Sequence, residues 1–330
     1  MKLLYLSCHS ILEYDELRLF EELDIDYFSL GSYLDPTNPV DPIRPALTHT
    51  VDPWLIGHAP DRNALTKEFL EYFDTIVVMH VPEWITNNWE LIKNKRVIWR
   101  TIGQSTPAVE KKLLAYRNLG LNVVRYSPTE QQIEGNIGMD AMIRFYKDPN
   151  EFKGYLGSGN EVITFAQNMK HRAEFCNYET WEKIAEGFNA RVYGPNNENS
   201  GERNGGFLTY EEMRQKYRDA RVYIYTGTQP ASYTLNFIEA LMTGIPVVAI
   251  GPTYANSLNI AGNTYEIPQI INNGVNGFWS DNVDELRKYI QALLNDIKLA
   301  RRIGEMGRYT AIQLFGKEVI KSYWKKFLEL

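Results

Sequence analysis

The chain has 330 residues, of which 44% are hydrophobic and 23% are charged, and its formal net charge is −6. This composition is typical of globular proteins, excludes the disordered and fibrous classes, and at this length favours two domains of roughly 150 residues each. The negative charge argues against a nucleic-acid-binding surface spread over the whole protein, although a local basic groove is compatible with it.

The cysteines and the apolar runs favour a cytoplasmic location. Cys8 and Cys176 are far apart and lack metal-ligand spacing, so we expect structural roles for both in a reducing compartment. The first ten residues, MKLLYLSCHS, carry a short apolar run without a small-residue cleavage site and predict a first strand. No stretch approaches the ~18 apolar residues of a membrane-spanning helix.

Apolar segments alternate with amphipathic ones through the first half of the chain. We expect strands at residues 2–7, 25–30, 74–80, 96–101 and 121–127, and helices at 13–22, 84–93 and 108–118. This alternation predicts right-handed crossovers and a parallel, doubly wound α/β sheet. The Asp-Ile-Asp tripeptide at 24–26 resembles a metal-binding motif of another transferase fold, but it lies on an alternating strand and we expect no metal there.

Residues 36–60 form a proline-rich segment with six prolines, which predicts a long loop without regular helix or central strand. Loops of this length are often functional. Aromatic and hydrogen-bonding side chains suit sugars and bases, so we expect an acceptor-binding element here, or else a brace between domains. The side chains concerned are Arg44, His49, Trp54 and His58.

A second, similar pattern follows a segment rich in glycine and charge at 147–161. We expect a first domain at 1–152, a linker at 153–159 and a second domain at 160–316. The strands of the second domain are expected at 161–166, 190–194, 221–227 and 245–251, with helices at 178–187, at 210–219, after Tyr233 and from Asp284.

The last segment predicts an amphipathic helix with a basic side. Its apolar face carries Val319, Ile320, Tyr323, Trp324, Phe327 and Leu328, and its polar side carries Lys321, Lys325 and Lys326. We expect this helix to dock on the protein itself. Peripheral contact with an anionic membrane is the alternative.

The strongest chemical signal is the stretch 230–251, in which a helix that begins on polar residues is followed by a buried strand. The amides of a helix N-terminus bind phosphate, and this helix follows a strand at the carboxyl end of a parallel sheet, where such sheets bind ligands. Glu239 lies five residues after Thr234, in reach of a ribose diol. A capped helix with a solvated glutamate is the structural alternative.

Residues 206–327 resemble the family-4 retaining glycosyltransferases of GT-B fold. The resemblance is carried by YRDARVYIYTGTQPASYTLNFIEALMTGIPVVA, by YEIPQIINNGVNGFWSDNVDELRKYI and by KLARRIGEMGR. It implies two Rossmann-like domains that face each other across a cleft, with residues 317–330 packing back on the first domain. Before residue 150 the resemblance is one of architecture only.

The resemblance assigns the donor site residue by residue. Glu239 matches the second glutamate of the family signature, which holds the ribose. Ser232, Tyr233 and Thr234, followed by Leu235, match a run whose amides face the donor diphosphate. Arg172, Gln167 and the extra cation Lys170 match the cationic loop on the diphosphate, unless they are a solvated surface group. Phe207 and Leu208 match the loop that encloses the base.

The sequence also departs from the family. Ala231 stands where the family has the first glutamate, which contacts the donor sugar. The resemblance therefore does not predict the identity of the donor sugar or the rate of transfer. The loop after the first strand lacks glycine, and His9 and Ser10 are candidates to replace its amides on the acceptor side. Arg100 and Gln104 occupy the place where relatives carry a histidine, and His80 is a further candidate at the end of a strand.

The resemblance implies transfer of a sugar from a UDP- or GDP-sugar to an unidentified acceptor, with retained configuration and with neither metal nor other cofactor. Lys170, Arg172 and His80 are the expected catalytic residues, and we expect a monomer or a homodimer. A nucleotide-sugar-binding protein with weak turnover and a sugar-nucleotide 2-epimerase remain alternatives. An oxidoreductase is disfavoured, since neither half shows a G-x-G-x-x-G turn.

Overall fold

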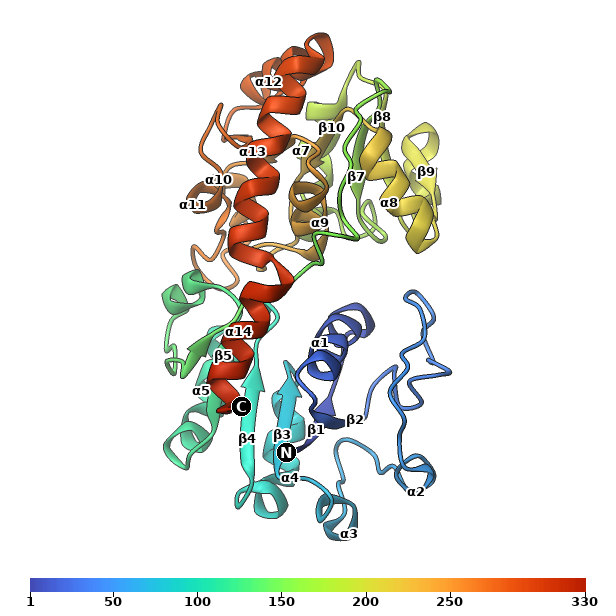
Figure 1. The fold of residues 1–330 in the computed structure, drawn as a ribbon. Coiled ribbons are helices and arrows are strands. Elements are labelled where there is room, and N and C mark those ends of the chain that lie inside the picture. Colours follow the sequence, from blue (N-terminus) through green and yellow to red (C-terminus); the bar gives the residue numbers. More distant parts are fainter. The chain divides into compact units, whose positions relative to one another are not determined.

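The computed structural model describes all 330 residues and divides the chain into two compact α/β units (Figure 1). The first unit comprises Met1–Phe145 and Ile320–Leu330, and the second comprises Tyr146–Val319. Residues 153–159, which the sequence predicts as a linker, lie within the second unit. Each unit is built on its own parallel sheet.

The sheet of the first unit has six parallel strands in the order β2-β1-β3-β4-β5-β6. These strands are β1 (Lys2–Leu6), β2 (Asp26–Ser29), β3 (Thr75–Met79), β4 (Arg96–Arg100), β5 (Asn122–Arg125) and β6 (Ala141–Met142). Every residue of β3, TIVVM, is buried. A parallel strand covered on both faces reads as a continuous apolar run, which is why the sequence shows this strand clearly.

Helical segments connect these strands: α1 (Ser10–Glu22), α2 (Pro53–Gly57), α3 (Lys67–Leu70), α4 (Pro82–Ile92), α5 (Pro107–Asn118) and the 3₁₀ helix η1 (Pro128–Gln132). The prediction that residues 36–60 contain no regular helix is wrong at α2. Asp52 accepts a hydrogen bond from the Trp54 amide at 2.9 Å, and Pro53 occupies the first helical position, where a missing N–H is tolerated.

The sheet of the second unit also has six parallel strands, in the order β12-β11-β10-β7-β8-β9. They are β7 (Val162–Phe165), β8 (Ala190–Tyr193), β9 (Asn204–Gly206), β10 (Val222–Tyr225), β11 (Val247–Ile250) and β12 (Phe278–Ser280). The strands β7, β10 and β11 are entirely buried, so the core of this unit lies on both faces of its central strands.

The helices of the second unit are α6 (Ala173–Cys176), α7 (Tyr178–Ala185), η2 (Glu198–Arg203), α8 (Tyr210–Asp219), α9 (Leu235–Thr243), α10 (Pro252–Ala255), α11 (Ile267–Ile270), α12 (Val283–Asn295) and α13 (Ile297–Phe315). Gly244 ends α9 with a φ of 93°, a conformation that favours glycine. A Cβ on Gly304 of α13 would lie 1.9 Å from the Gly244 carbonyl oxygen, so the close packing of α13 on α9 requires glycine there.

The last helix, α14 (Lys317–Leu328), packs its apolar face into the first unit from Ile320 onward. The Trp324 ring is fully buried and meets the Phe20 ring edge-on, with centroids 5.3 Å apart. The guanidinium of Arg96 lies 4.8 Å above the Phe327 ring. No helix in the structure combines the length and the apolar character needed to cross a membrane.

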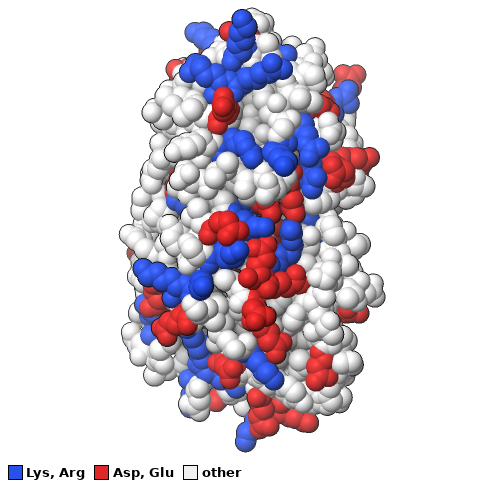
Figure 2. Space-filling view, viewed as in Figure 1, with Lys and Arg blue, Asp and Glu red and all other residues white.

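Charges of both signs lie next to one another on the surface. On the face drawn in Figure 2, Lys and Arg side chains are interspersed with Asp and Glu side chains. In the first unit, Lys112 pairs with Glu83, and Arg117 pairs with Asp140 at 2.6 Å. Since exposed pairs of this kind contribute little to stability, the apolar cores stabilise each unit.

We predict that Trp324→Ala lowers the free energy of unfolding by about 3 kcal/mol, because it removes a large buried ring and leaves a cavity beside Phe20. Urea denaturation followed by tryptophan fluorescence measures this change. Tyr323→Ala is the matched control on the same helix: its ring is 44% exposed, so a change within about 0.5 kcal/mol is expected. Equal effects of the two substitutions would contradict the described packing of α14.

Candidate functional site

The order of the strands in each sheet defines one position at which a ligand is expected to bind. In the second unit, β7 has β8 on one side and β10 on the other, so the connections after β7 and β10 leave in opposite directions. Open parallel sheets bind ligands outside the carboxyl ends of their strands at such a switch point. The loops at this point are residues 166–172 and 226–234. They carry most of the donor-site residues that the sequence predicts.

Asn197 holds the loop after β7. Its side chain is fully buried; Oδ1 accepts from the Met169 amide at 2.8 Å, and Nδ2 donates to the carbonyls of Ala166 at 2.7 Å and Gly194 at 3.0 Å. A buried amide with three internal hydrogen bonds fixes the backbone that it contacts. Asn197 could not be singled out from the sequence, because an asparagine among Pro, Asn and Glu residues is typical of an ordinary turn.

The predicted cations of this loop are on its surface. Gln167 and Lys170 are exposed, and Arg172 is half-buried at the start of α6. The Nζ of Lys170 lies 5.5 Å from the centroid of the Tyr178 ring, and the amide of Arg172 donates to the Asn168 carbonyl at 3.0 Å. The loop therefore presents two positive charges to solvent from a fixed backbone.

Gln229 organises the loop after β10. Its backbone amide donates to the Phe175 carbonyl at 2.8 Å, its Nε2 donates to Ser257 Oγ at 2.9 Å, and its Oε1 accepts from the Leu258 amide at 2.9 Å. The side chain is buried, so these contacts tie the start of the Ala231 turn to α6 and to the segment after α10. No role for Gln229 was predicted from the sequence.

The start of α9 differs in one respect from the expected phosphate cradle. Ser232 and Tyr233 are buried, and the Thr234 amide donates to the hydroxyl of buried Tyr225 at 3.0 Å. That amide was expected to face a diphosphate, but it already has an internal acceptor. Leu235 and Asn236 occupy the first helical positions, whose N–H groups have no acceptor inside a helix.

The side chain of Asn236 joins α9 to the other loop of the switch point. Its Nδ2 donates to the carbonyl of Phe165, the last residue of β7. The first turn of α9 is therefore held directly at the carboxyl end of the central strand, beside the loop that carries Lys170 and Arg172.

Glu239 is not solvated, so the structural alternative of an exposed glutamate on α9 is wrong. The residue is 3% exposed, and its Oε1 lies 2.8 Å from the Nζ of Lys147, which is equally buried. The Tyr217 hydroxyl donates to Oε2 at 3.3 Å. Lys147 was not singled out in the sequence, since one lysine in a segment rich in charge carries no recognisable pattern.

Phe207 and Leu208 lie between β9 and α8. The Phe207 ring is 60% exposed, and Leu208 is half-buried. An exposed aromatic ring can pack on a planar ligand. The structure thus leaves the ring available for the predicted contact with a base.

In the first unit the switch point lies between β1 and β3. His9 caps α1, because its Nδ1 accepts from the Leu12 amide at 3.4 Å, and Ser10 Oγ donates to Asp41 Oδ2 at 2.8 Å. The two side chains that were expected to replace a glycine-rich loop therefore have structural partners on α1 and on the proline-rich segment.

His80 follows β3 at the same switch point and has unusual geometry. Its φ is +62°, a left-handed conformation that is uncommon for a residue with a side chain, and its Nδ1 is buried without a hydrogen-bond partner. Burial lowers the pKa of its imidazole, while nearby Glu83 opposes this to a smaller degree. The imidazole is therefore neutral at neutral pH and able to accept a proton.

The prediction of Arg100 as an acceptor-side residue does not agree with its position. Its side chain is fully buried: Nε donates to Glu16 Oε1 at 2.9 Å, and Nη1 donates to the Ile143 carbonyl at 2.6 Å. A buried arginine paired in this way supports the fold and cannot reach a substrate. Gln104, predicted beside it, is exposed.

The aromatic residues of the proline-rich segment have partners of their own. His49 stacks on Tyr27, with centroids 4.1 Å apart, and Trp54 stacks between His58 at 4.3 Å and Tyr72 at 4.8 Å. Val51, Asp52 and Leu55 line a cavity of about 100 Å³ together with the first residue of β1 and the first three residues of β2. This part of the segment thus lies at the amino edge of the sheet, opposite the switch point, and offers no support for an acceptor-binding role.

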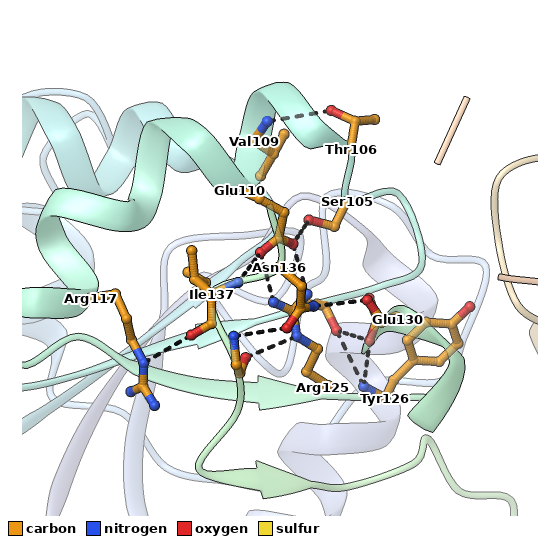
Figure 3. Close-up of polar contacts among 12 residues, drawn as sticks. Ser105, Thr106, Val109, Glu110, Arg117, Arg125, Tyr126, Glu130, Asn136 and Ile137 are labelled. Carbon is orange, nitrogen blue, oxygen red and sulfur yellow. Dashed lines mark hydrogen bonds and ion pairs between the residues drawn. The ribbon is translucent and has the colours of Figure 1, made fainter. Parts of the chain in front are cut away.

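Two carboxylates are buried at the carboxyl edge of the first sheet (Figure 3). Arg125 forms two parallel hydrogen bonds of 2.8 Å with Glu110, which also accepts from Ser105 Oγ at 2.6 Å. Glu130 accepts from Thr101 Oγ1 at 2.7 Å and from the Tyr126 amide at 3.1 Å. Burial raises the pKa of Glu130 to about 7, whereas the charge of Arg125 lowers it to a lesser extent.

Residues 172–315 match the family of glycosyl transferase-like proteins. This match begins at Arg172, the last residue of the first loop of the second switch point, and includes the loop after β10 and the whole of α9. No curated protein sequence matches the chain significantly.

Solved structures resemble the whole chain. Sucrose-phosphate synthase from Thermosynechococcus elongatus has a TM-score of 0.69 at 16% identity, over 100% of this chain and 98% of that one. A glycosyltransferase from Rickettsia africae has a TM-score of 0.68 at 15% identity, over 99% and 98%. HepE from Anabaena, in complex with UDP and glucose, has a TM-score of 0.65 at 14% identity, over 100% and 99%.

The protein has the GT-B glycosyltransferase fold. The predicted α/β class with two Rossmann-like units is confirmed by the two parallel sheets and by these structural neighbours. At identities this low the similarity establishes the fold. The expected roles of individual site residues stay predictions.

We predict that Glu130→Gln stabilises the protein more at pH 8 than at pH 5. Folded Glu130 keeps its proton up to about pH 7, whereas the unfolded residue releases it near its ordinary value of 4.5. Stability of the wild type therefore falls as the pH rises between these two values, and the neutral amide removes this loss. We expect the free energy of unfolding of the variant, measured by urea denaturation, to increase by about 2 kcal/mol relative to that of wild type when the pH is raised from 5 to 8.

Glu134→Gln, at an exposed position nearby, is the control and should show no such gain. If the difference in free energy of unfolding between wild type and Glu130→Gln does not change with pH, Glu130 does not keep its proton in the folded protein.

Proposed function

We propose that the protein is a glycosyltransferase that transfers a sugar from a nucleoside diphosphate sugar to an acceptor. The match to glycosyl transferase-like proteins supports this, because it covers the predicted donor residues from Arg172 onward. The HepE structures are described as complexes with UDP, with UDP and glucose, and with UDP-glucose. A UDP-sugar is accordingly the donor that we favour, with a GDP-sugar as the next candidate.

The observation that carries the proposal is the grouping at the second switch point. The first turn of α9 is tied to the end of β7 by Asn236, and the loop after β7 carries Lys170 and Arg172. Departure of a diphosphate develops negative charge, which fixed cations and helix amides stabilise. We assign the backbone amides around Leu235 and the side chains of Lys170 and Arg172 to contacts with the diphosphate. We assign the Gln167 amide to the edge of the diphosphate site.

The remaining donor contacts follow from the resemblance. We assign Glu239 to the ribose hydroxyls and Phe207, with Leu208, to the base. Ser232, Tyr233 and Thr234 shape the turn beside the diphosphate. Because the Thr234 amide already donates to the Tyr225 hydroxyl, we assign the expected phosphate contact to the next residue, Leu235, in the first helical turn.

On the side of the first unit, His80 is our candidate for a residue at the reacting groups. His80 lies at the end of a central strand and has a neutral imidazole, a strained backbone and an Nδ1 without a hydrogen-bond partner. These features are typical of a residue that takes part in catalysis. We propose retention of anomeric configuration without a metal, through a route in which the leaving phosphate helps to deprotonate the acceptor. Proton nuclear magnetic resonance of the first-formed product tests retention, and full activity in EDTA tests the absence of a metal requirement.

Ala231 supports a second candidate function. A nucleotide-sugar-binding protein with little turnover would need the diphosphate and ribose contacts but not the carboxylate that relatives place on the donor sugar. In the structure Ala231 is half-buried at the turn before α9, and no carboxylate replaces the missing one within that turn. Turnover separates the two functions, since both predict binding of the donor.

The first experiment is a panel of UDP-, GDP-, ADP- and TDP-sugars, measured by calorimetry for binding and by chromatography for slow hydrolysis. We expect micromolar to millimolar binding of at least one sugar nucleotide, together with slow release of its sugar. Binding without any release or transfer would favour the binding protein. Absence of binding to every member of the panel would exclude both functions.

We predict that substitutions in the two units affect different steps. Arg172→Ala should weaken binding of the nucleoside diphosphate by about 10- to 100-fold, because it removes a charged hydrogen-bond donor. His80→Ala should leave that affinity within about twofold and lower the rate of transfer by about 100-fold. Calorimetry with the free nucleotide and initial rates with the full donor measure the two effects.

Arg191→Ala serves as the charge control, since that side chain is about half exposed on β8 and should change neither quantity. Weakened nucleotide binding in His80→Ala, or unaltered binding in Arg172→Ala, would contradict the assignment of these residues.

A further inference from the structure

Lys147 occupies a fixed place near the start of the second unit. Its backbone amide donates to the Phe315 carbonyl at 3.0 Å, and it forms an isolated parallel bridge with Gly316. The residue is only 2% exposed. A lysine is rarely buried to this extent unless it has a charged partner, and Glu239 supplies that partner.

The segment after Lys147 is fastened to several helices of the same unit. Arg308 of α13 donates to the carbonyls of Phe152, Met242 and Pro149, the last at 2.7 Å. Lys317 pairs with Asp148 at 2.8 Å. Because the chain is held at Lys147 and directly after it, the lysine has little freedom to move its ammonium group away from α9.

Glu239 lies on a helix whose other central residues are apolar and buried. A buried carboxylate is costly unless it is paired and hydrogen-bonded. Lys147 contacts Oε1 at 2.8 Å, and the Tyr217 hydroxyl contacts Oε2 at 3.3 Å. The two contacts come from opposite oxygens, so together they define the plane of the carboxylate and compensate its charge.

We propose that Lys147 is a positioning residue for nucleotide recognition, holding the Glu239 carboxylate charged and oriented for the ribose diol. This inference rests on the proposed function, in which Glu239 receives the ribose hydroxyls. Lys147 acts through Glu239 and does not itself contact the nucleotide. A lysine that merely stabilised the fold would affect every ligand equally, whereas a positioning lysine affects only ligands with ribose hydroxyls.

The experiment compares whichever of UDP, GDP and ADP binds wild type most tightly with its 2′,3′-dideoxy form, by calorimetry. Two hydrogen bonds to a carboxylate predict a wild-type preference of about 100-fold for the ribose form. In Lys147→Met, which keeps the length of the side chain but removes its charge, we expect that preference to fall to about 10-fold or less. Affinity for the dideoxy form should stay within about threefold of wild type.

Lys317→Met is the matched control, because it removes a lysine that pairs with the same segment through Asp148. It should retain the full preference, even where it lowers stability. Tyr217→Phe provides a second variant if Lys147→Met does not fold: it removes only the hydroxyl at Oε2, and the preference should fall by at least threefold.

The outcomes distinguish this inference from the function on which it rests. If wild type binds a nucleotide but Lys147→Met weakens both forms by the same factor, the positioning role is overturned and the proposed function stands. If Tyr217→Phe, used in its place, keeps the full preference, the positioning role is likewise overturned. If wild type binds none of the three nucleotides but does bind a TDP-sugar, the inference is overturned and the proposed function stands; if it binds no sugar nucleotide at all, both are overturned.

Discussion

Parallel strand pairing is the constraint on which the rest of this structure depends. When all six strands of a sheet run in one direction, every loop that follows a strand lies at the same edge. Segments as distant in sequence as Lys170 and Leu235 are thereby placed at one switch point in the second unit. In the first unit the same rule places His80 beside the loop after β1. The candidate site residues of each unit therefore gather at the carboxyl edge of its sheet.

Buried charges accompany this arrangement, and the chain pairs several of them with a partner of opposite sign. Glu16 pairs with Arg100 and Glu110 with Arg125 in the first unit, and Glu239 pairs with Lys147 in the second. Buried pairs add little net stability compared with apolar residues of similar size, but removing one partner is costly. They act mainly on geometry: each joins a strand or connecting segment to a helix at a defined register. That role explains why Arg100, which resembles a surface cation in sequence, is a structural residue.

The fold was predictable in outline because its signals are local. Strands such as TIVVM and VVAI are continuous apolar runs between polar turns, and the turn chemistry of Pro, Gly and Thr marks the helix starts. The exception, α2, depends on a single capping aspartate and a proline at the first helical position. The donor loops were predictable for a similar reason, since residues 230–251 join a polar helix start to a buried strand. What could not be read locally was the set of partners, including Asn197 and Gln229, whose amides hold those loops.

The sequence by itself determined the α/β class, the two repeated halves and the helix start that we assign to a diphosphate, because periodicity and capping act over a few neighbouring residues. Tertiary structure alone decided which polar side chains reach solvent. In the folded protein Arg100 is buried, the Thr234 amide donates to the Tyr225 hydroxyl, and Lys147 pairs with Glu239, which lies 92 positions later in the chain. These outcomes depend on desolvation and on contacts between distant segments, and a folded core creates both.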